Sequence, residues 1–202
     1  MQASKILILL LFVALASCNS PKSPVELQKW VEENDHGLNK KKSIGEYQLE
    51  FQYKPLSYVL CKEAQPGWNA KNYKAREDEL KGLEYYDVLL SVDGAKDIVS
   101  YQNESKDQQF YDKQYYLSFG FQNDIWLETD SVRVPCVLYH FERTYDLSNK
   151  RKIVLAFQLP ENQKQKDRVL VINGERLGFG IVRTIFENND IQSVPELDLE
   201  SL

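Results

Sequence analysis

A strict two-residue alternation constrains the fold of this chain most. From Tyr47 to Tyr53 every odd position is apolar or aromatic and every even position is polar. This is the period of a β-strand with one buried face, because successive side chains of a strand point to opposite sides. A second, more apolar strand is expected at 56–62. Similar runs predict strands at 85–92, 115–121, 125–128, 132–141, 153–157, 169–172 and 177–186.

The fold class follows from how these runs are separated. Turn signals recur between them often enough to favour antiparallel pairing over alternating β-α-β units. The run 153–157 is apolar on both faces and is expected at the centre of a sheet. Asn173-Gly174 lies between apolar runs and predicts a type I′ hairpin turn. We expect a mainly β (α+β) protein, an antiparallel β-sandwich of immunoglobulin-like architecture with about nine strands and two or three short helices.

Helix signals are fewer. Ser23, followed by Pro24 and by Glu26 three positions after the serine, has the pattern of a capping box and predicts a helix that ends by Gly37. A charged stretch at 70–83 is spaced for one helical face, and a third short helix is expected after Ser105.

The N-terminal segment has the plan of a secretory signal peptide. Lys5 precedes an apolar run of eleven residues, 6–16, which is too short to span a membrane, since spanning takes about 20 residues. Leu15-Ala16-Ser17-Cys18 resembles the lipobox of bacterial lipoproteins. That resemblance implies that Cys18 becomes the acylated N-terminus of the mature protein. The alternative is an ordinary signal peptide cut near Ala16, which leaves Cys18 as a plain thiol.

The division of the chain follows from this resemblance. We expect a signal peptide at 1–17, a lipidated tether at 18–23, one β-rich domain at 24–195 and a frayed acidic tail at 196–202. The body also resembles small uncharacterised lipoproteins of the Bacteroides group. In that group Asp130-Ser131-Val132 is similar to an O-glycosylation acceptor, which implies a glycan on Ser131. Asn19, and the lack of an acidic run after Cys18, favour the outer membrane facing the periplasm.

Two further cysteines, Cys61 and Cys136, form an even pair in an exported chain. A disulfide between them is one interpretation. Because both lie in apolar runs, two buried free thiols are the other.

Catalytic signals are sparse. The chain has two histidines, and it lacks the Gly-x-Ser-x-Gly, His-Glu-x-x-His and Cys-x-x-Cys motifs. His140 and Glu142 share one face of a predicted strand, but a zinc site needs further ligands. We expect no metal, no cofactor and no enzymatic activity, with a hydrolase using His140 and Glu142 as a distant alternative. The net charge of −5 argues against a nucleic-acid partner.

The content of aromatic side chains is the one unusual feature of the composition, with 12 Tyr, 9 Phe and 3 Trp. Neighbouring aromatics on a strand point to opposite faces, so each pair offers one outward ring. Tyr116, Trp126 and His140 are therefore candidate ligand contacts. The sequence favours a membrane-anchored, non-enzymatic protein that binds an envelope protein or serves an accessory role, with one aromatic-rich sheet face or the 115–126 region as the contact. The alternative is a carbohydrate-binding module that stacks exposed Trp and Tyr rings on a glycan.

Overall fold

The structure, a computed structural model, describes residues 20–101, 107–130, 132–142 and 148–202. Within these residues eight strands form a single sheet in the order β1-β2-β3-β6-β5-β4-β7-β8. Every neighbouring pair of strands is antiparallel. The strands are β1 (Asn39–Ile44), β2 (Tyr47–Lys54), β3 (Leu83–Val92), β4 (Ile125–Thr129), β5 (Val132–Phe141), β6 (Arg151–Gln158), β7 (Arg168–Gly174) and β8 (Gly180–Phe186).

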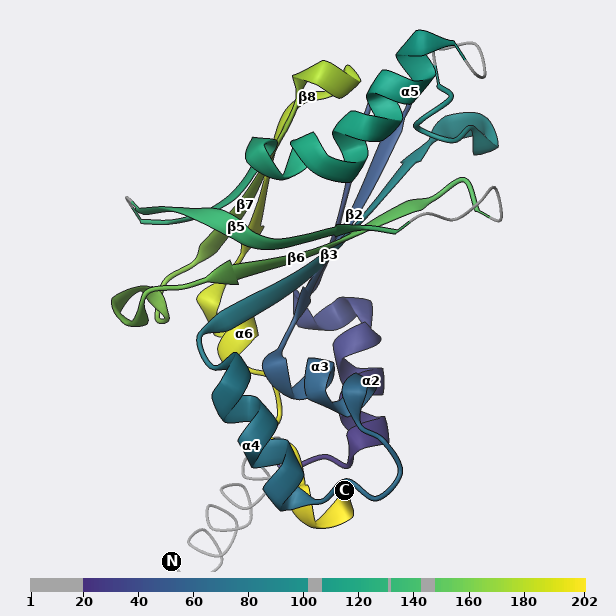
Figure 1. Ribbon diagram of the computed structural model, residues 1–202. Coiled ribbons are helices and arrows are strands. Elements are labelled where there is room, and N and C mark those ends of the chain that lie inside the picture. The colour runs from purple at the N-terminus through teal and green to yellow at the C-terminus, as the bar shows by residue number, and fades with distance from the viewer. Residues whose placement is uncertain (1–19, 102–106, 131, 143–147) are drawn as a thin grey trace, which may run out of the picture.

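The sheet curls into a nearly closed, barrel-like shape (Figure 1). The ring of Phe186 on β8 lies 5.3 Å from that of Tyr86 on β3 and 6.3 Å from that of Tyr53 on β2, measured between centroids. No ladder joins the edge strands β1 and β8 in the described ranges. The predicted immunoglobulin-like sandwich is not confirmed, because the strands belong to one sheet rather than two.

One hydrophobic core fills this sheet. The alternation predicted for 47–53 is confirmed, since Leu49 and Phe51 are buried while the even positions of β2 are half-buried. The central place of 153–157 is also confirmed, because β6 lies in the middle of the strand order and Ile153 and Leu155 are fully buried. Buried side chains from the strands and from α2, α3 and α6 belong to this core.

Helices lie at two ends of the sheet (Figure 1). The helices α2 (Pro24–Glu32), α3 (Leu56–Glu63), α4 (Ala70–Leu80) and α6 (Asn188–Gln192) gather at one end, which we call the helical end, and α5 (Gln108–Tyr115) lies at the other. The capping box at Ser23 is confirmed, because its amide donates to the Glu26 carboxylate at 3.0 Å. Of the helices in the described ranges, none has both the length and the apolar character that a bilayer crossing requires.

The strand predicted at 56–62 is wrong, because these residues form α3. A short apolar run fits either a strand or a helix by its period alone. Helical winding places Tyr58 and Cys61 on one buried face. The Tyr58 hydroxyl also donates to the Glu32 carboxylate of α2 at 2.9 Å. Packing against a neighbouring helix therefore decided the structure of this segment.

The strand predicted at 115–121 is also wrong. Tyr115 ends α5, and the chain continues through a π turn, Tyr116–Gly120, into a 3-10 turn, Phe121–Asp124. Leu117 is buried while Phe119 is exposed, which a strand with one buried face would not give, because residues two apart share a face; the backbone bonds here are helical. More helix is thus present than the sequence indicated.

The predicted hairpin forms between β7 and β8, but its connection is not a type I′ turn. The ladder ends where Gly174 pairs with Gly180, and Glu175–Leu177 form a 3-10 turn between them. Gly174 has a φ of −97°, outside the left-handed region. Its hydrogen instead leaves room for the Phe179 ring, which would lie 1.9 Å from a Cβ at this position. The glycine serves close packing rather than turn geometry.

The first and last described segments are joined. Lys22 and Leu197 form a parallel bridge. The Lys22 amide donates to the Glu196 carbonyl, and the Lys22 carbonyl accepts from the Asp198 amide, both at 2.8 Å. The segment 196–202, expected to be a frayed tail, is therefore bonded to Lys22, a residue of the predicted tether.

Candidate functional site

Tyr116, the first predicted contact residue, is buried in the π turn and 6 % exposed. Its hydroxyl donates to the Asp124 carboxylate at 2.5 Å, and the Arg176 guanidinium lies 4.0 Å from the centre of its ring. Burial is the main cause that raises the pKa of this hydroxyl, followed by the bond to Asp124. Tyr116 supports the turn and offers no ring face to a ligand.

Trp126, the second predicted contact, is half-buried on β4. The Arg133 guanidinium stacks 3.6 Å from its ring centre, and the indole N–H donates to the Glu128 carboxylate at 2.7 Å. Glu128 also pairs with Arg183, and this cation is the first cause of its lowered pKa. One face of the indole is thus covered by a cation within the protein itself.

His140, the third predicted contact, is exposed on β5. It lines a shallow cavity of about 440 Å³ together with Phe119 and Tyr139. Glu142 does not join it in an ion pair, because the Glu142 carboxylate pairs with the Lys152 ammonium at 3.2 Å. No group of three or more potential metal ligands occurs within the described part of the chain.

A row of exposed rings lies beside this cavity. Three aromatic side chains spaced four residues apart are largely exposed: Tyr111 (52 %), Tyr115 (68 %) and Phe119 (56 %). We call these three residues the aromatic ridge. The rings of Tyr115 and Phe119 lie 5.1 Å apart between centroids and are tilted by 52°. A second shallow cavity of about 400 Å³ runs along the ridge, and Phe119 lines both cavities. The ridge and His140 therefore belong to one continuous surface.

The local sequence explains why the ridge is displayed. Asp107 caps α5 by accepting from the Phe110 amide at 2.8 Å, which starts the helix. The π turn then carries the helical path to Phe119, while Leu117 anchors the turn in the core. Gly120 leaves room for the Tyr116 ring, which a Cβ would approach to 2.8 Å. Turns of this kind recur at functional sites.

Sequence reasoning missed the ridge although its signal was present. In a helical backbone positions 111, 115 and 119 lie on one face about one turn apart, whereas in a strand, where they would also share a face, neighbours of this set would be roughly 13 Å apart. The strand predicted at 115–121 therefore hid that these rings lie close enough together to form one row. The sequence did indicate the region, 115–126, but not the side chains that reach solvent.

The two cysteines of the body are free thiols. Cys61 is buried on α3 and Cys136 is half-buried on β5. Burial raises the pKa of both thiols, that of Cys136 to about 11. The other two predicted modification sites, Cys18 and Ser131, lie outside the described residues.

A scan of protein-family models and searches of curated proteins and of solved structures returned no match to this chain.

Proposed function

We propose that this protein is a lipid-anchored protein of the cell envelope, acylated at Cys18, in the outer membrane and facing the periplasm. The support is the order of Lys5, the apolar run 6–16 and the lipobox Leu15-Ala16-Ser17-Cys18. Stable anchoring by lipid takes more than one acyl chain, which a diacylglycerol on the Cys18 sulfur would supply.

Replacement of Cys18 tests the anchor. Cys18→Ala is expected to move the protein from the membrane fraction to the soluble fraction. Cys136→Ala, which removes a half-buried thiol from the body, is the matched control and should leave the protein with the membrane. Retention of the Cys18→Ala protein in membranes would overturn the proposal.

The proposed role of the body is to bind a partner protein through the aromatic ridge, without enzymatic activity. The observation that carries this proposal is the exposure of three large rings in one row. Large apolar side chains gathered on a surface mark interaction sites, and Tyr and Phe are enriched where partner proteins bind. The first residues that the structure describes, from 20 on, lead into α2 at the helical end, and α5 lies at the other end (Figure 1). A short tether would therefore present the ridge away from the membrane.

Site-specific photo-crosslinking in cells tests the partner. A crosslinking amino acid at position 115 should give a discrete adduct, and adding Phe119→Ser should reduce it. The matched control is the same amino acid at position 185, because Ile185 is 55 % exposed on β8, away from the ridge. No adduct at 115, or the same adducts at both positions, would count against the proposal.

A glycan is the alternative ligand, supported by the same exposed rings. Stacking platforms for sugars use rings in nearly one plane, so the 52° tilt between Tyr115 and Phe119 favours a protein partner. Titration with oligosaccharides, monitored by NMR, decides between the two. Shifts confined to α5 that Tyr115→Ser abolishes would favour the glycan.

Ser131 is proposed to carry an O-linked glycan in the connection from β4 to β5. Its neighbour Asp130 is exposed and has a φ of 47°, a left-handed conformation common in turns. Mass spectrometry of the native protein tests this, since an unmodified Ser131 peptide would remove the proposal.

A further inference from the structure

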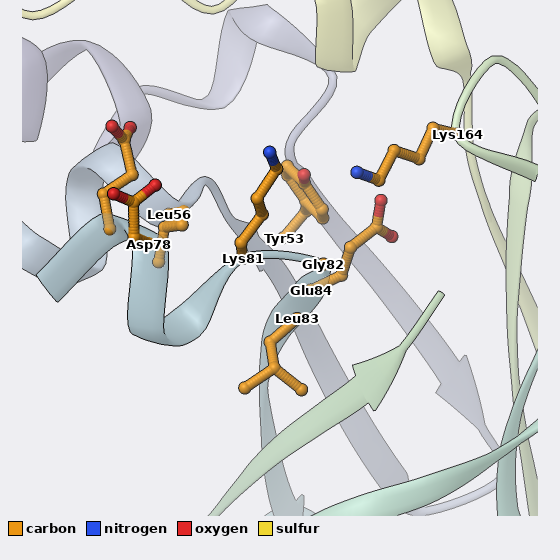
Figure 2. A pocket seen from close by; sticks show the side chains of 9 residues that line it. Tyr53, Leu56, Asp78, Lys81, Gly82, Leu83, Glu84 and Lys164 are labelled. Carbon is orange, nitrogen blue, oxygen red and sulfur yellow. The ribbon is translucent and has the colours of Figure 1, made fainter. Parts of the chain in front are cut away.

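A polar cavity of about 340 Å³ lies beside α4 at the helical end (Figure 2), whereas α5 lies at the other end of the sheet (Figure 1). It opens between the end of α4, the start of β3 and the end of β2, and the loop that carries Lys164 closes one side. Tyr53, Asp78, Lys81, Glu84 and Lys164 are among its lining residues. Nothing in the proposed partner binding uses this cavity.

The deepest polar group of the cavity is the hydroxyl of Tyr53. The residue is 7 % exposed, and its ring packs between those of Tyr86 and Phe186. Its hydroxyl has no hydrogen-bond partner within the described ranges, and it points into the cavity (Figure 2). Burial, and then the charge of Glu84, raise the pKa of Tyr53, so it keeps its proton at neutral pH. Because this hydroxyl opens onto the cavity, water or a ligand there can accept its hydrogen bond.

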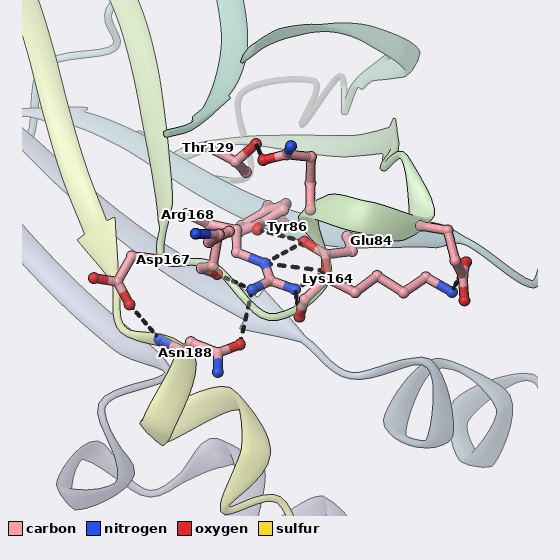
Figure 3. A network of polar contacts seen from close by, with 10 residues as sticks. Glu84, Tyr86, Thr129, Lys164, Asp167, Arg168 and Asn188 are labelled. Carbon is pink, nitrogen blue, oxygen red and sulfur yellow. Dashed lines mark hydrogen bonds and ion pairs between the residues drawn. The ribbon is translucent and has the colours of Figure 1, made fainter. Parts of the chain in front are cut away.

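The wall behind Tyr53 is fixed by an ion pair. Arg168, 1 % exposed, donates to both carboxylate oxygens of Glu84 at 2.7–3.2 Å (Figure 3). It also donates to the Lys164 carbonyl at 2.9 Å and to the Asn188 side chain at 3.0 Å. Tyr86 donates to Glu84 at 3.2 Å. The charge of Glu84 is thus compensated, and the loop bearing Lys164 is tied to the sheet.

Two ammonium groups face the same space as the Tyr53 hydroxyl. Figure 2 shows the ends of Lys81 and Lys164 directed toward the hydroxyl, while Asp78 lies farther along α4. Lys164 pairs with Glu161 at 2.6 Å. Lys164 first, and Lys81 to a lesser extent, lower the pKa of the Glu161 carboxyl. Glu161 is 82 % exposed at its side chain, so water competes for this pair and a ligand can replace it.

We propose that this cavity binds a small molecule through a single carboxylate group, which accepts from Tyr53 and lies between the ammonium groups of Lys81 and Lys164. A carboxylate has two oxygens that accept hydrogen bonds from such donors and takes the place of the exposed Glu161 carboxylate. The free volume exceeds the roughly 30 Å³ share of one water about tenfold, which leaves room for the rest of an organic acid.

The charges around the cavity favour a monoanion over a phosphate. Glu77, Asp78 and Glu84 line it together with the two lysines, so three carboxylates face two ammonium groups. Arg168 compensates Glu84, but Glu77 and Asp78 have no ion-pair partner within the described part of the chain. A dianionic phosphate would be repelled more strongly than a carboxylate, because Coulomb repulsion scales with charge. Hydroxyl or amino groups elsewhere on the ligand would suit Glu77 and Asp78.

An NMR titration of the ¹⁵N-labelled full chain in detergent tests the proposal. Acetate is the probe, acetamide is its uncharged isostere, and inorganic phosphate is the competing anion. Acetate is expected to shift the amide signals of Gly82 and Leu83 in a saturable way, and acetamide is not. Equal effects of acetate and acetamide, no saturable shift with acetate, or tighter binding of phosphate would each overturn the assignment.

Three single substitutions separate binding from folding. Tyr53→Phe should weaken acetate binding at least about tenfold without lowering the melting temperature, because its hydroxyl holds no other side chain in place. Tyr85→Phe is the matched control, since Tyr85 is buried on the other face of β3 and does not line the cavity. Glu161→Gln should tighten binding by removing the competing carboxylate. Unchanged binding by Tyr53→Phe would overturn the proposal, as would weaker binding by Glu161→Gln.

Discussion

The hydroxyl of Tyr47 on β2 donates a 2.6 Å hydrogen bond to the carbonyl of Leu177, just before β8. The ring of Phe179 packs against Tyr47 at 5.3 Å between centroids. These residues lie 130 positions apart in the chain, and they connect opposite ends of the strand order. The curvature of the sheet is therefore held by side chains where backbone pairing stops.

Loss of this hydrogen bond should weaken the fold. Tyr47→Phe leaves the buried Leu177 carbonyl without its donor and is expected to lower the free energy of unfolding by about 1–3 kcal/mol. Urea unfolding followed by circular dichroism measures it. Tyr85→Phe removes a hydroxyl that has no hydrogen-bond partner within the described ranges, so it should change stability far less. Equal losses in the two variants would contradict the role given to Tyr47.

The ion pair between Arg168 and Glu84 should matter more than any exposed pair. Arg168→Met removes the cation that pairs with the half-buried Glu84 carboxylate. It is expected to lower the free energy of unfolding by about 3–5 kcal/mol, the usual effect of breaking a buried pair. Lys150→Met, which breaks an exposed pair with Glu50, should cost less than about 1 kcal/mol. Comparable losses in urea unfolding would show that the buried network adds no more than surface charges do.

The free energy of unfolding should fall at low pH, partly because the ion pairs of Glu50 are lost. A hydrogen bond from Lys150 is the first cause that lowers the pKa of Glu50, and Lys41 adds to it. A carboxyl group with a lowered pKa in the folded state contributes stability above its unfolded pKa, and the contribution disappears as pH falls through the folded value. Glu50→Gln should therefore be less stable than the wild type at pH 7, and the difference should shrink toward pH 3.

The control for this pH series is Glu175→Gln, because the Glu175 carboxylate has no ion-pair partner in the described part of the chain. Its difference from the wild type should stay nearly constant between pH 7 and pH 3. If the Glu50→Gln difference also stays constant, the ion pair with Lys150 contributes no measurable stability.

The thiols of the folded body should react slowly. A pKa of about 11 leaves Cys136 with roughly 240-fold less thiolate at pH 8 than an unperturbed thiol with a pKa near 8.5. Alkylation by iodoacetamide should therefore be slow in the native protein, accelerate as pH approaches 11, and become fast after unfolding in guanidinium. Peptide mapping without reductant should recover Cys61 and Cys136 as separate alkylated peptides. A linked pair would show that the disulfide forms.

Local patterns in the sequence determined many of the elements. The two-residue period of 47–53 predicts β2 with Leu49 and Phe51 facing the core. It does so because side chains alternate between the two faces of any strand, so the apolar positions all fall on one face. The capping box at Ser23 set the start of α2 for a similarly local reason, since a serine and a glutamate three positions later satisfy each other. These features need no knowledge of the rest of the chain.

The tertiary structure alone decided how the strands close and which side chains form sites. Local sequence gives no sign that Arg168 is buried, because its partner Glu84 lies 84 positions away. The same holds for the segment 56–62, whose apolar run became a helix through packing on α2. The aromatic ridge required the helical path from Tyr111 to Phe119, and the cavity at Tyr53 required α4 and the Lys164 loop to meet β2. Contacts between distant segments set each of these, and a local period carries no information about them.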